Sequence, residues 1–316
     1  MAMRRQSVVL GMLLTPVTLF LGVFFLLPLC IIAVFSFLSP GLYGGVEWSF
    51  YHWNYGRIFG WADGIIEIYE PIYLQILFRS LSFAALTVGL TLILCYPVAF
   101  WVSRLSERWR LVFMFLITLP FFSSLIVRLY AWLLILKPSG LLNTVLLSIG
   151  AISEPLEILY TPTAVVLGMV YVMVPFMFLP LYSAVDNLDR AQIEASLDLG
   201  ANRLQPFLKV VLPQTLPGIM GGAVIVFIPS VGNFVVPDVL GGAKGLMIGN
   251  LVEQQFLSSR NWPFGSALSM IIMAVVLLGF VIPSAGRLLT AEGRVALPLL
   301  TRIMMWLGKM ILWGIL

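Results

Sequence analysis

The sequence predicts an all-α integral membrane protein with six transmembrane helices. Hydrophobic residues make up 60% of its 316 residues and charged residues only 10%, whereas soluble domains carry about 25% charged residues. A helix needs about 20 mostly apolar residues to cross the hydrocarbon core, and several runs reach that length. The basic residues are dispersed rather than clustered, so we expect contact with membrane lipid and no nucleic-acid partner.

The chain lacks the residue patterns of an enzyme active site. His52 is the only histidine, and Cys30 and Cys95 lie inside apolar runs, so neither a metal-ligand set nor a disulfide is expected. No Gly-x-x-x-x-Gly-Lys-Ser/Thr sequence is present, so the chain has no phosphate-binding loop. We therefore predict no catalytic residue, metal or cofactor in this chain. If the protein works against a gradient, another subunit must supply the energy.

The first span is expected over about residues 8–38. This apolar run is roughly twice as long as a signal-peptide core of about 7–15 residues, so we expect it to be retained. Arg4 and Arg5 precede it, which favours a cytoplasmic N-terminus. Pro16 and Pro28 predict a kinked or interrupted helix.

Residues 39–73 form a polar segment rich in Trp and Tyr. Such side chains are typical of the belt that anchors a protein at a membrane interface, and a docking surface for a partner is the alternative. The aromatic residues in question are Trp48, Tyr51, Trp53, Tyr55 and Trp61.

Five further spans are predicted along the chain. Pro175 and Pro180 are expected to interrupt the fourth of the six spans, and Lys137 and Arg128 are expected to snorkel to the outer interface. With the N-terminus inside, basic residues are enriched on the cytoplasmic side, as the positive-inside rule requires. The expected bounds are about 74–102, 111–136, 162–184, 218–236 and 264–289.

The C-terminal residues 290–316 are expected to form an amphipathic tail. Arg302 and Lys309 are seven residues apart and share a helix face, which favours a helix lying in the membrane interface. A seventh span is the alternative. The predicted organisation is a first span with its external aromatic loop (1–73), a core of five spans (74–289) and this tail.

A hydrophilic run, residues 186–217, separates the fourth span from the fifth. We expect a helix over Arg190–Asn202 with Asp189 as its N-cap, loosened at its end by Gly200 and stopped by Pro206. Such a helix suits docking to another protein, and a solvated connector is the alternative. Its apolar stripe would consist of Ile193, Leu197, Gly200 and Leu204.

This run resembles the EAA loop of bacterial ABC importer permeases. The loop reads Glu-Ala-Ala, three residues, Gly, nine residues, then Ile, any residue, Leu-Pro. Here the matching residues are Glu194-Ala195-Ser196, Gly200 and Val210-Val211-Leu212-Pro213. Ser196 replaces the second Ala and Val210 replaces Ile.

The resemblance implies the type I ABC importer permease fold with six transmembrane helices. It also implies that the helix in this loop is a coupling helix, seated in a groove of a cytoplasmic ATPase. The residues expected to couple are Glu194, Ala195, Ser196, Asp198, Gly200, Arg203 and Pro213.

The stretch from Pro229 to Asp238 is expected to break the fifth span near its outer end. Broken helices at membrane depth are tolerated where they line a cavity, and an acid there is a functional candidate. The alternative is that Asp238 caps a helix at the surface. Aromatic rings nearby offer faces for a cation, with plain packing as the alternative. The predicted substrate-pathway residues are Asp238, Phe234, Asn233, Phe227 and Tyr171.

Several segments resemble the spermidine/putrescine importer permeases of the PotB type. They are 138–144 (PSGLLNT), 160–168 (YTPTAVVLG), 174–182 (VPFMFLPLY), 238–244 (DVLGGAK), 247–250 (MIGN) and 261–267 (NWPFGSA).

This narrower resemblance implies a permease subunit of an ATP-driven polyamine importer in the bacterial inner membrane. Its partners would be a second, PotC-like permease, two PotA-like ATPase subunits that bind ATP and Mg, and a periplasmic PotD-like binding protein. An ABC importer for another small solute and a secondary transporter are the alternatives.

Overall fold

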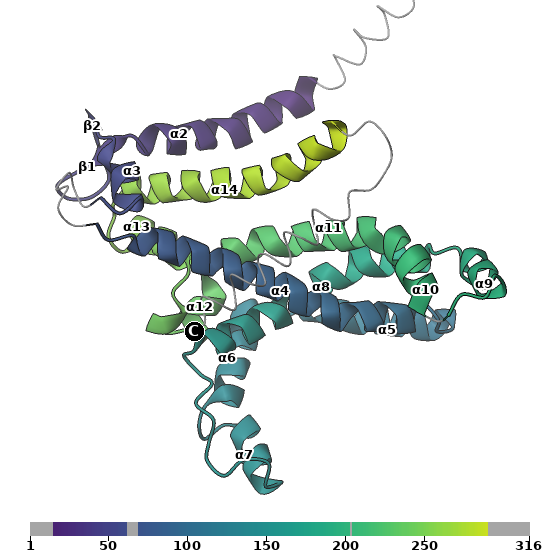
Figure 1. Ribbon diagram of the computed structural model, residues 1–316. Coiled ribbons are helices and arrows are strands. Elements are labelled where there is room, and N and C mark those ends of the chain that lie inside the picture. The colour runs from purple at the N-terminus through teal and green to yellow at the C-terminus, as the bar shows by residue number, and fades with distance from the viewer. Residues whose placement is uncertain (1–14, 62–68, 203, 290–316) are drawn as a thin grey trace, which may run out of the picture. The chain divides into compact units, whose positions relative to one another are not determined.

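The structure is mostly helical and divides into two compact units, Met1–Gln75 with Leu251–Leu316, and Ile76–Asn250 (Figure 1). The computed structural model describes residues 15–61, 69–202 and 204–289. Within the described residues, six helical segments are long and apolar enough to cross a membrane, as predicted. These segments are Thr15–Phe35, Ile72–Val102, Leu125–Ser148, Pro162–Asp186, Phe207–Val231 and Trp262–Gly279.

In the first unit, α2 (Leu27–Phe35) packs against α14 (Trp262–Leu289). A π turn, η1 (Gly22–Leu26), precedes α2. Pro28 has no N–H to donate to the carbonyl of Phe24, and the wider turn accommodates that missing bond. The expected distortion of the first span is therefore present as a π turn.

A small β-hairpin follows α2 in the first unit. Strand β1 (Leu38–Pro40) pairs antiparallel with β2 (Val46–Phe50), and the short helix α3 (Trp53–Ile58) comes next. The buried Asn54 amide donates to the carbonyl oxygen of Ser36 at 3.0 Å. This bond ties α3 back to the end of the first span.

The sixth span agrees closely with the prediction, since α14 begins at Trp262 and the expected start was residue 264. The tail at 290–316, for which an amphipathic helix was predicted, lies outside the described residues.

The second span also matches, because α4 covers Ile72–Val102. The third does not begin where predicted. Helix α5 (Glu107–Thr118) ends in a 3₁₀ turn, η2 (Leu119–Phe122), and two residues of extended backbone separate that turn from α6 (Leu125–Leu136). The segment of spanning length is Leu125–Ser148 rather than 111–136, because the backbone break after Pro120 divides an unbroken apolar run.

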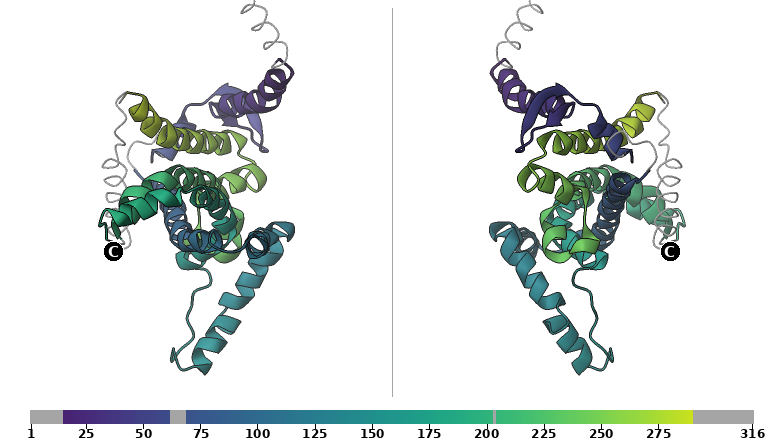
Figure 2. Two further views of the ribbon diagram at one scale, coloured as in Figure 1. Left: turned by 90° about the vertical axis from the view of Figure 1, so that its right-hand side faces the viewer. Right: turned by 90° about the vertical axis from the view of Figure 1, so that its left-hand side faces the viewer.

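Beyond α6, the short helix α7 (Leu141–Ser148) lies at the tip of an arm of the second unit (Figures 1 and 2). Gly140 donates its N–H to the carbonyl of Lys137 at 2.8 Å, which closes the turn between α6 and α7. The buried Asn143 side chain donates to the carbonyls of Lys137 and Leu156 and accepts from the Leu156 N–H at 2.8 Å. One amide therefore holds both sides of the arm together.

The core of the second unit forms around α8 (Pro162–Asp186). The predicted interruption at Pro175 and Pro180 is wrong, because α8 runs continuously through both prolines. Close packing of α8 against the fifth span stabilises this continuous helix. A Cβ at Gly218 would contact the Ala184 Cβ and the Pro180 carbonyl, so only glycine allows this approach of the two helices.

The fifth span starts earlier than the predicted 218–236. Three consecutive elements, α10 (Leu204–Pro206), the π turn η3 (Phe207–Val211) and α11 (Leu212–Val231), form one helical run. The run ends at residues 232–234, which confirms the predicted break.

After the break, the buried side-chain amide of Asn250 connects the start of α13 to the end of the break. Asn250 Nδ2 donates to the Phe234 carbonyl at 2.8 Å, and Asn250 Oδ1 accepts from the Met247 N–H at 3.2 Å. The elements beyond the break are α12 (Val235–Leu240), η4 (Ala243–Gly245) and α13 (Ile248–Leu257).

Candidate functional site

The hydrophilic run 186–217 contains the helix α9 (Arg190–Asp198), and the start of this helix confirms the predicted cap. Asp189 Oδ1 accepts a hydrogen bond from the Ala191 N–H at 3.0 Å, and Gln192 Nε2 donates to Asp189 Oδ2 at 3.3 Å. These bonds satisfy a free N–H in the first turn and place a negative charge at the positive end of the helix.

The end of α9 corrects the prediction, because the helix stops at Asp198 rather than at Asn202. Gly200 has a φ of +85°, in the left-handed region. Its N–H donates to the Leu197 carbonyl at 2.9 Å, and the next N–H, of Ala201, donates to the Ser196 carbonyl at 3.2 Å. This pair of bonds is a Schellman motif, which closes the helix at the glycine.

Asn202 instead starts the following helix. Its Oδ1 accepts from the Gln205 N–H at 3.0 Å, while Gln205 Oε1 accepts from the Asn202 N–H at 3.2 Å. This reciprocal arrangement is a capping box. The prediction that Pro206 stops a helix is therefore wrong. Pro206 occupies the first turn of a new helix, where a missing N–H costs little. Arg203 lies outside the described residues.

The surface of α9 is largely open. Glu194, Ala195 and Asp198 are exposed, and Ser196 is half-buried with its hydroxyl donating to the Ile193 carbonyl at 2.7 Å. Two leucines beside them are exposed as well, Leu197 by 45% and Leu199 by 89%. Leu197 lies on α9 and Leu199 just after its end, so both leucines are accessible to a partner.

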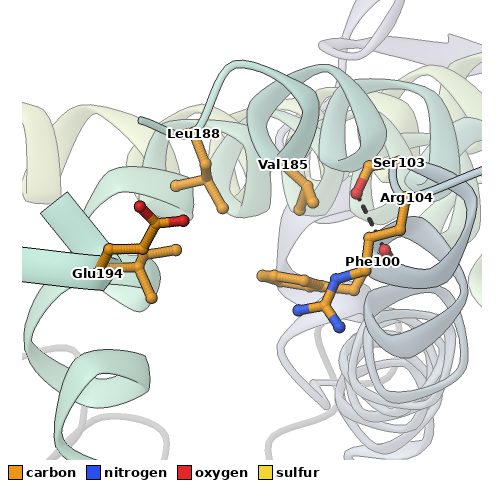
Figure 3. A pocket seen from close by; sticks show the side chains of 7 residues that line it. Phe100, Ser103, Arg104, Val185, Leu188 and Glu194 are labelled. Atoms are coloured by element: carbon orange, nitrogen blue, oxygen red, sulfur yellow. Dashed lines mark hydrogen bonds between the residues drawn. The ribbon is translucent and has the colours of Figure 1, made fainter. Parts of the chain in front are cut away.

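A cavity of about 220 Å³ lies between α9 and the ends of α4 and α8 (Figure 3). Glu194 and Arg104 project into it from opposite sides, and within the described residues they form no ion pair with each other. Across the loop, Gln214 Nε2 donates to Gln192 Oε1 at 2.8 Å. The lining residues are Phe100, Ser103, Arg104, Val185, Leu188, Ile193 and Glu194.

Phe100 of α4 and Arg104, just after its end, were not predicted to line this cavity, because both residues are far from the loop in sequence. Pro213, the last predicted coupling residue, lies exposed in the first turn of α11. Its missing N–H leaves the Lys209 carbonyl without its usual helical partner, which accounts for the π turn before it.

Three predicted pathway residues lie together at the break in the fifth span. Asn233 Oδ1 accepts from the Val236 N–H at 3.1 Å and so caps α12. Phe234 is 44% exposed, and Asp238 is exposed one turn further on. Because Asn233 supplies the cap, capping does not explain Asp238. Phe227 lies earlier on α11 and is half-buried.

Tyr171 does not offer a free ring face in the way predicted. The Arg128 guanidinium lies 5.8 Å from the centre of its ring, and the Trp132 ring is 5.5 Å away. The chain's own cation therefore uses this aromatic surface. Within the described residues, no group of three or more His, Cys, Asp and Glu side chains is arranged to hold a metal.

Comparisons with known proteins agree with this architecture. Residues 85–295 match the family described as binding-protein-dependent transport system inner membrane component. The structure is similar to a bacterial ABC transporter involved in the import of alginate, with a TM-score of 0.63 and 17% identity, covering 92% of this chain and 98% of that one. At this identity the likeness concerns the fold.

Curated relatives are similar over most of the chain. The spermidine/putrescine transport system permease protein PotB of Haemophilus influenzae is 42% identical over 73% of this chain and 81% of its own length. PotB of Salmonella typhimurium is 37% identical over 87% of this chain and 94% of its own. The Escherichia coli inner membrane ABC transporter permease protein YdcU is 32% identical over 69% and 74%. The chain therefore belongs to the binding-protein-dependent transport system inner membrane component family, as a non-catalytic, multi-pass permease subunit that works with a separate ATPase.

Proposed function

We propose that this chain forms half of the translocation pathway of an ATP-driven importer of the polyamines spermidine and putrescine. The observation that carries the proposal is the 37–42% identity to permeases named for these solutes, over 73–87% of the chain. A dication or trication of this kind needs local negative charge along its path, and Asp238 is an exposed carboxylate at the broken helix.

Asp238 would face the outer end of the pathway and attract an ammonium group. A single exposed carboxylate binds an ammonium weakly, by about 0.2–1 kcal/mol, so acids of a second, PotC-like permease would complete the site. Phe234 and Asn233 would line the same opening, with Phe227 further along the path. Tyr171 would contribute through Arg128 rather than by touching the substrate.

Coupling would run through α9. A pair of PotA-like ATPase subunits would bind ATP and Mg and receive the exposed face of α9, with Glu194 and Asp198 as polar contacts and Ala195 allowing close approach. Ser196, Gly200 and Pro213 would keep the helix and its connections in shape, and Arg203 would add a basic contact. Closure of the ATPases would press α9 toward the cavity and bring Glu194 closer to Arg104. In this topology the N-terminus and the coupling loop are cytoplasmic, and a periplasmic binding protein delivers the solute.

The experiment that tests this function measures ATP hydrolysis by the assembled complex in lipid vesicles. The complex is compared with no binding protein, with empty binding protein and with binding protein loaded with spermidine. We expect stimulation by the loaded form, together with uptake of labelled spermidine. Stimulation by a binding protein that carries another solute would retain the permease role and replace the substrate. Uptake in the absence of any ATPase subunit would instead indicate a secondary transporter.

A further inference from the structure

A charged side chain of the second unit lies inside a membrane span without a charged partner. Arg128 is on α6, and its guanidinium contacts the ring of Tyr171 on α8 at 5.8 Å. Tyr171 is the tenth residue of the 25-residue helix α8, so at 1.5 Å per residue it lies roughly 14 Å from one end of that helix and roughly 22 Å from the other. The Arg128 guanidinium therefore lies beside the middle part of the α8 span, and its expected snorkelling to the outer interface stays a prediction.

Within the described part of the chain, the Arg128 side chain has no hydrogen bond and no ion pair. Its Nε is buried and has no partner, and the ion pair that the described residues do form joins Arg110 to Asp186. An aromatic ring compensates a guanidinium only in part. Ionisable groups at this depth pair with one another or with carbonyl groups, so the charge of Arg128 calls for a further group.

The surface next to Arg128 is open on one side. On α6, Leu129 and Leu136 are fully buried and mark the face that packs inside the unit. The other side of Arg128 carries Ser124, Val127 and Ala131, which are exposed, Val127 by 66%. We refer to Ser124, Val127, Arg128 and Ala131 as the α6 edge. Its small residues allow another helix to approach closely.

We propose that the α6 edge is a contact surface for a transmembrane helix of a second membrane subunit, and that this helix presents a carboxylate to Arg128. The inference rests on the proposed function, in which a second permease completes the pathway. Charge complementarity selects the occupant. A transported polyamine has the same sign of charge as Arg128, and lipid phosphates lie at the surfaces of a hydrocarbon core about 30 Å thick.

Cross-linking from the neighbouring residue tests the contact without altering Arg128. A photoreactive amino acid replaces Val127 in the complete complex, and the cross-linked product is mapped by mass spectrometry. We expect a cross-link to a membrane span of the second subunit, within one helical turn of an Asp or Glu. Cross-links to lipid alone, or to a span without an acidic residue at that depth, would overturn the proposal.

Neutralising the charge tests the pairing. Arg128→Met keeps a flexible apolar stem and removes the charge, and Arg128→Lys keeps the charge. Lys137→Met is the control, because it removes a cation beside the end of the same helix. We expect Arg128→Met to weaken copurification of the second subunit roughly tenfold, as polar contacts between membrane helices allow. Arg128→Lys should lose less and Lys137→Met nothing. Copurification of Arg128→Met at the wild-type level would contradict the pairing.

A charge exchange completes the test. Arg128→Glu should prevent assembly, and replacing the mapped acid of the second subunit by Arg should restore it. These readouts measure assembly rather than uptake. A failure of spermidine transport in the wild-type complex would therefore refute the proposed substrate and leave the contact to be judged by its own result.

Discussion

Replacing Gly200 tests the proposed coupling role of α9 most directly. Gly200 can act by adopting the left-handed conformation that ends the helix, or by letting the ATPase approach the backbone closely, and the structure allows these two roles to be tested separately. Gly200 has a φ of +85°, and a Cβ built on it meets no atom within 4 Å. A substitution therefore clashes with nothing in the chain and acts through backbone conformation. A residue other than glycine in the left-handed region costs roughly 1–2 kcal/mol, which changes the ratio of closed to opened Schellman ends roughly 5- to 30-fold. We expect Gly200→Asp to reduce solute-stimulated ATP hydrolysis and uptake, by no more than this factor if strain acts alone.

Two further variants distinguish strain from contact with the ATPase. Asn tolerates the left-handed conformation better than Ala does, yet it is the larger side chain. If conformation alone matters, Gly200→Asn should retain more coupling than Gly200→Ala; if the ATPase backbone approaches closely, Asn should be the worse. Gly89→Ala on α4 is the control, because its Cβ also meets nothing and its φ is not positive. Wild-type uptake by Gly200→Asp would refute the coupling role.

Three other substitutions probe the cap, the break and the pathway. Asp189→Ala removes the N-cap of α9 at a cost of about 1 kcal/mol and should reduce solute-stimulated ATP hydrolysis, whereas Asp189→Ser should preserve it. Asn250→Ala leaves the Phe234 carbonyl and the Met247 N–H unpaired, so the purified chain should lose about 1–3 kcal/mol of stability, seen as a lower unfolding midpoint. An unchanged midpoint would show that the two Asn250 hydrogen bonds do not stabilise the chain. Asp238→Asn should raise the spermidine concentration for half-maximal uptake by up to about fivefold, and an unchanged value would remove Asp238 from the pathway.

Features set by neighbouring residues were predictable from the sequence. Asp189 caps α9 as expected because its carboxylate needs only the backbone two residues away. The break at residues 232–234 also follows from local composition. Gly200 was expected inside the helix and Pro206 at its end, but Gly200 lies just after α9 and Pro206 in the first turn of the next helix. A glycine can end a helix in the left-handed conformation, and a proline can begin one. The residue type identified a boundary, but not which side of it the residue occupies.

Features that depend on packing between residues distant in sequence could not be predicted from local sequence patterns. Pro175 and Pro180 stay inside α8 because α11 packs against it through Gly218, a contact between residues distant in sequence. The cavity beside α9 includes Arg104, which follows the end of α4, for the same reason. The contact of Arg128 with Tyr171 likewise joins two helices that hydropathy treats separately.

Both ends of α9 are closed by bonds made inside residues 189–201, and Asn202 begins an independent helix. The nine-residue helix thus carries its own termination signals and needs none from the spans on either side. If α9 seats in the ATPase as proposed, grafting residues 189–201 from one permease to another, together with the Gln214 contact of α11, should transfer the choice of ATPase. Under that proposal, the choice of ATPase and the choice of solute would be set by stretches of sequence that do not overlap, and each could change during evolution without the other.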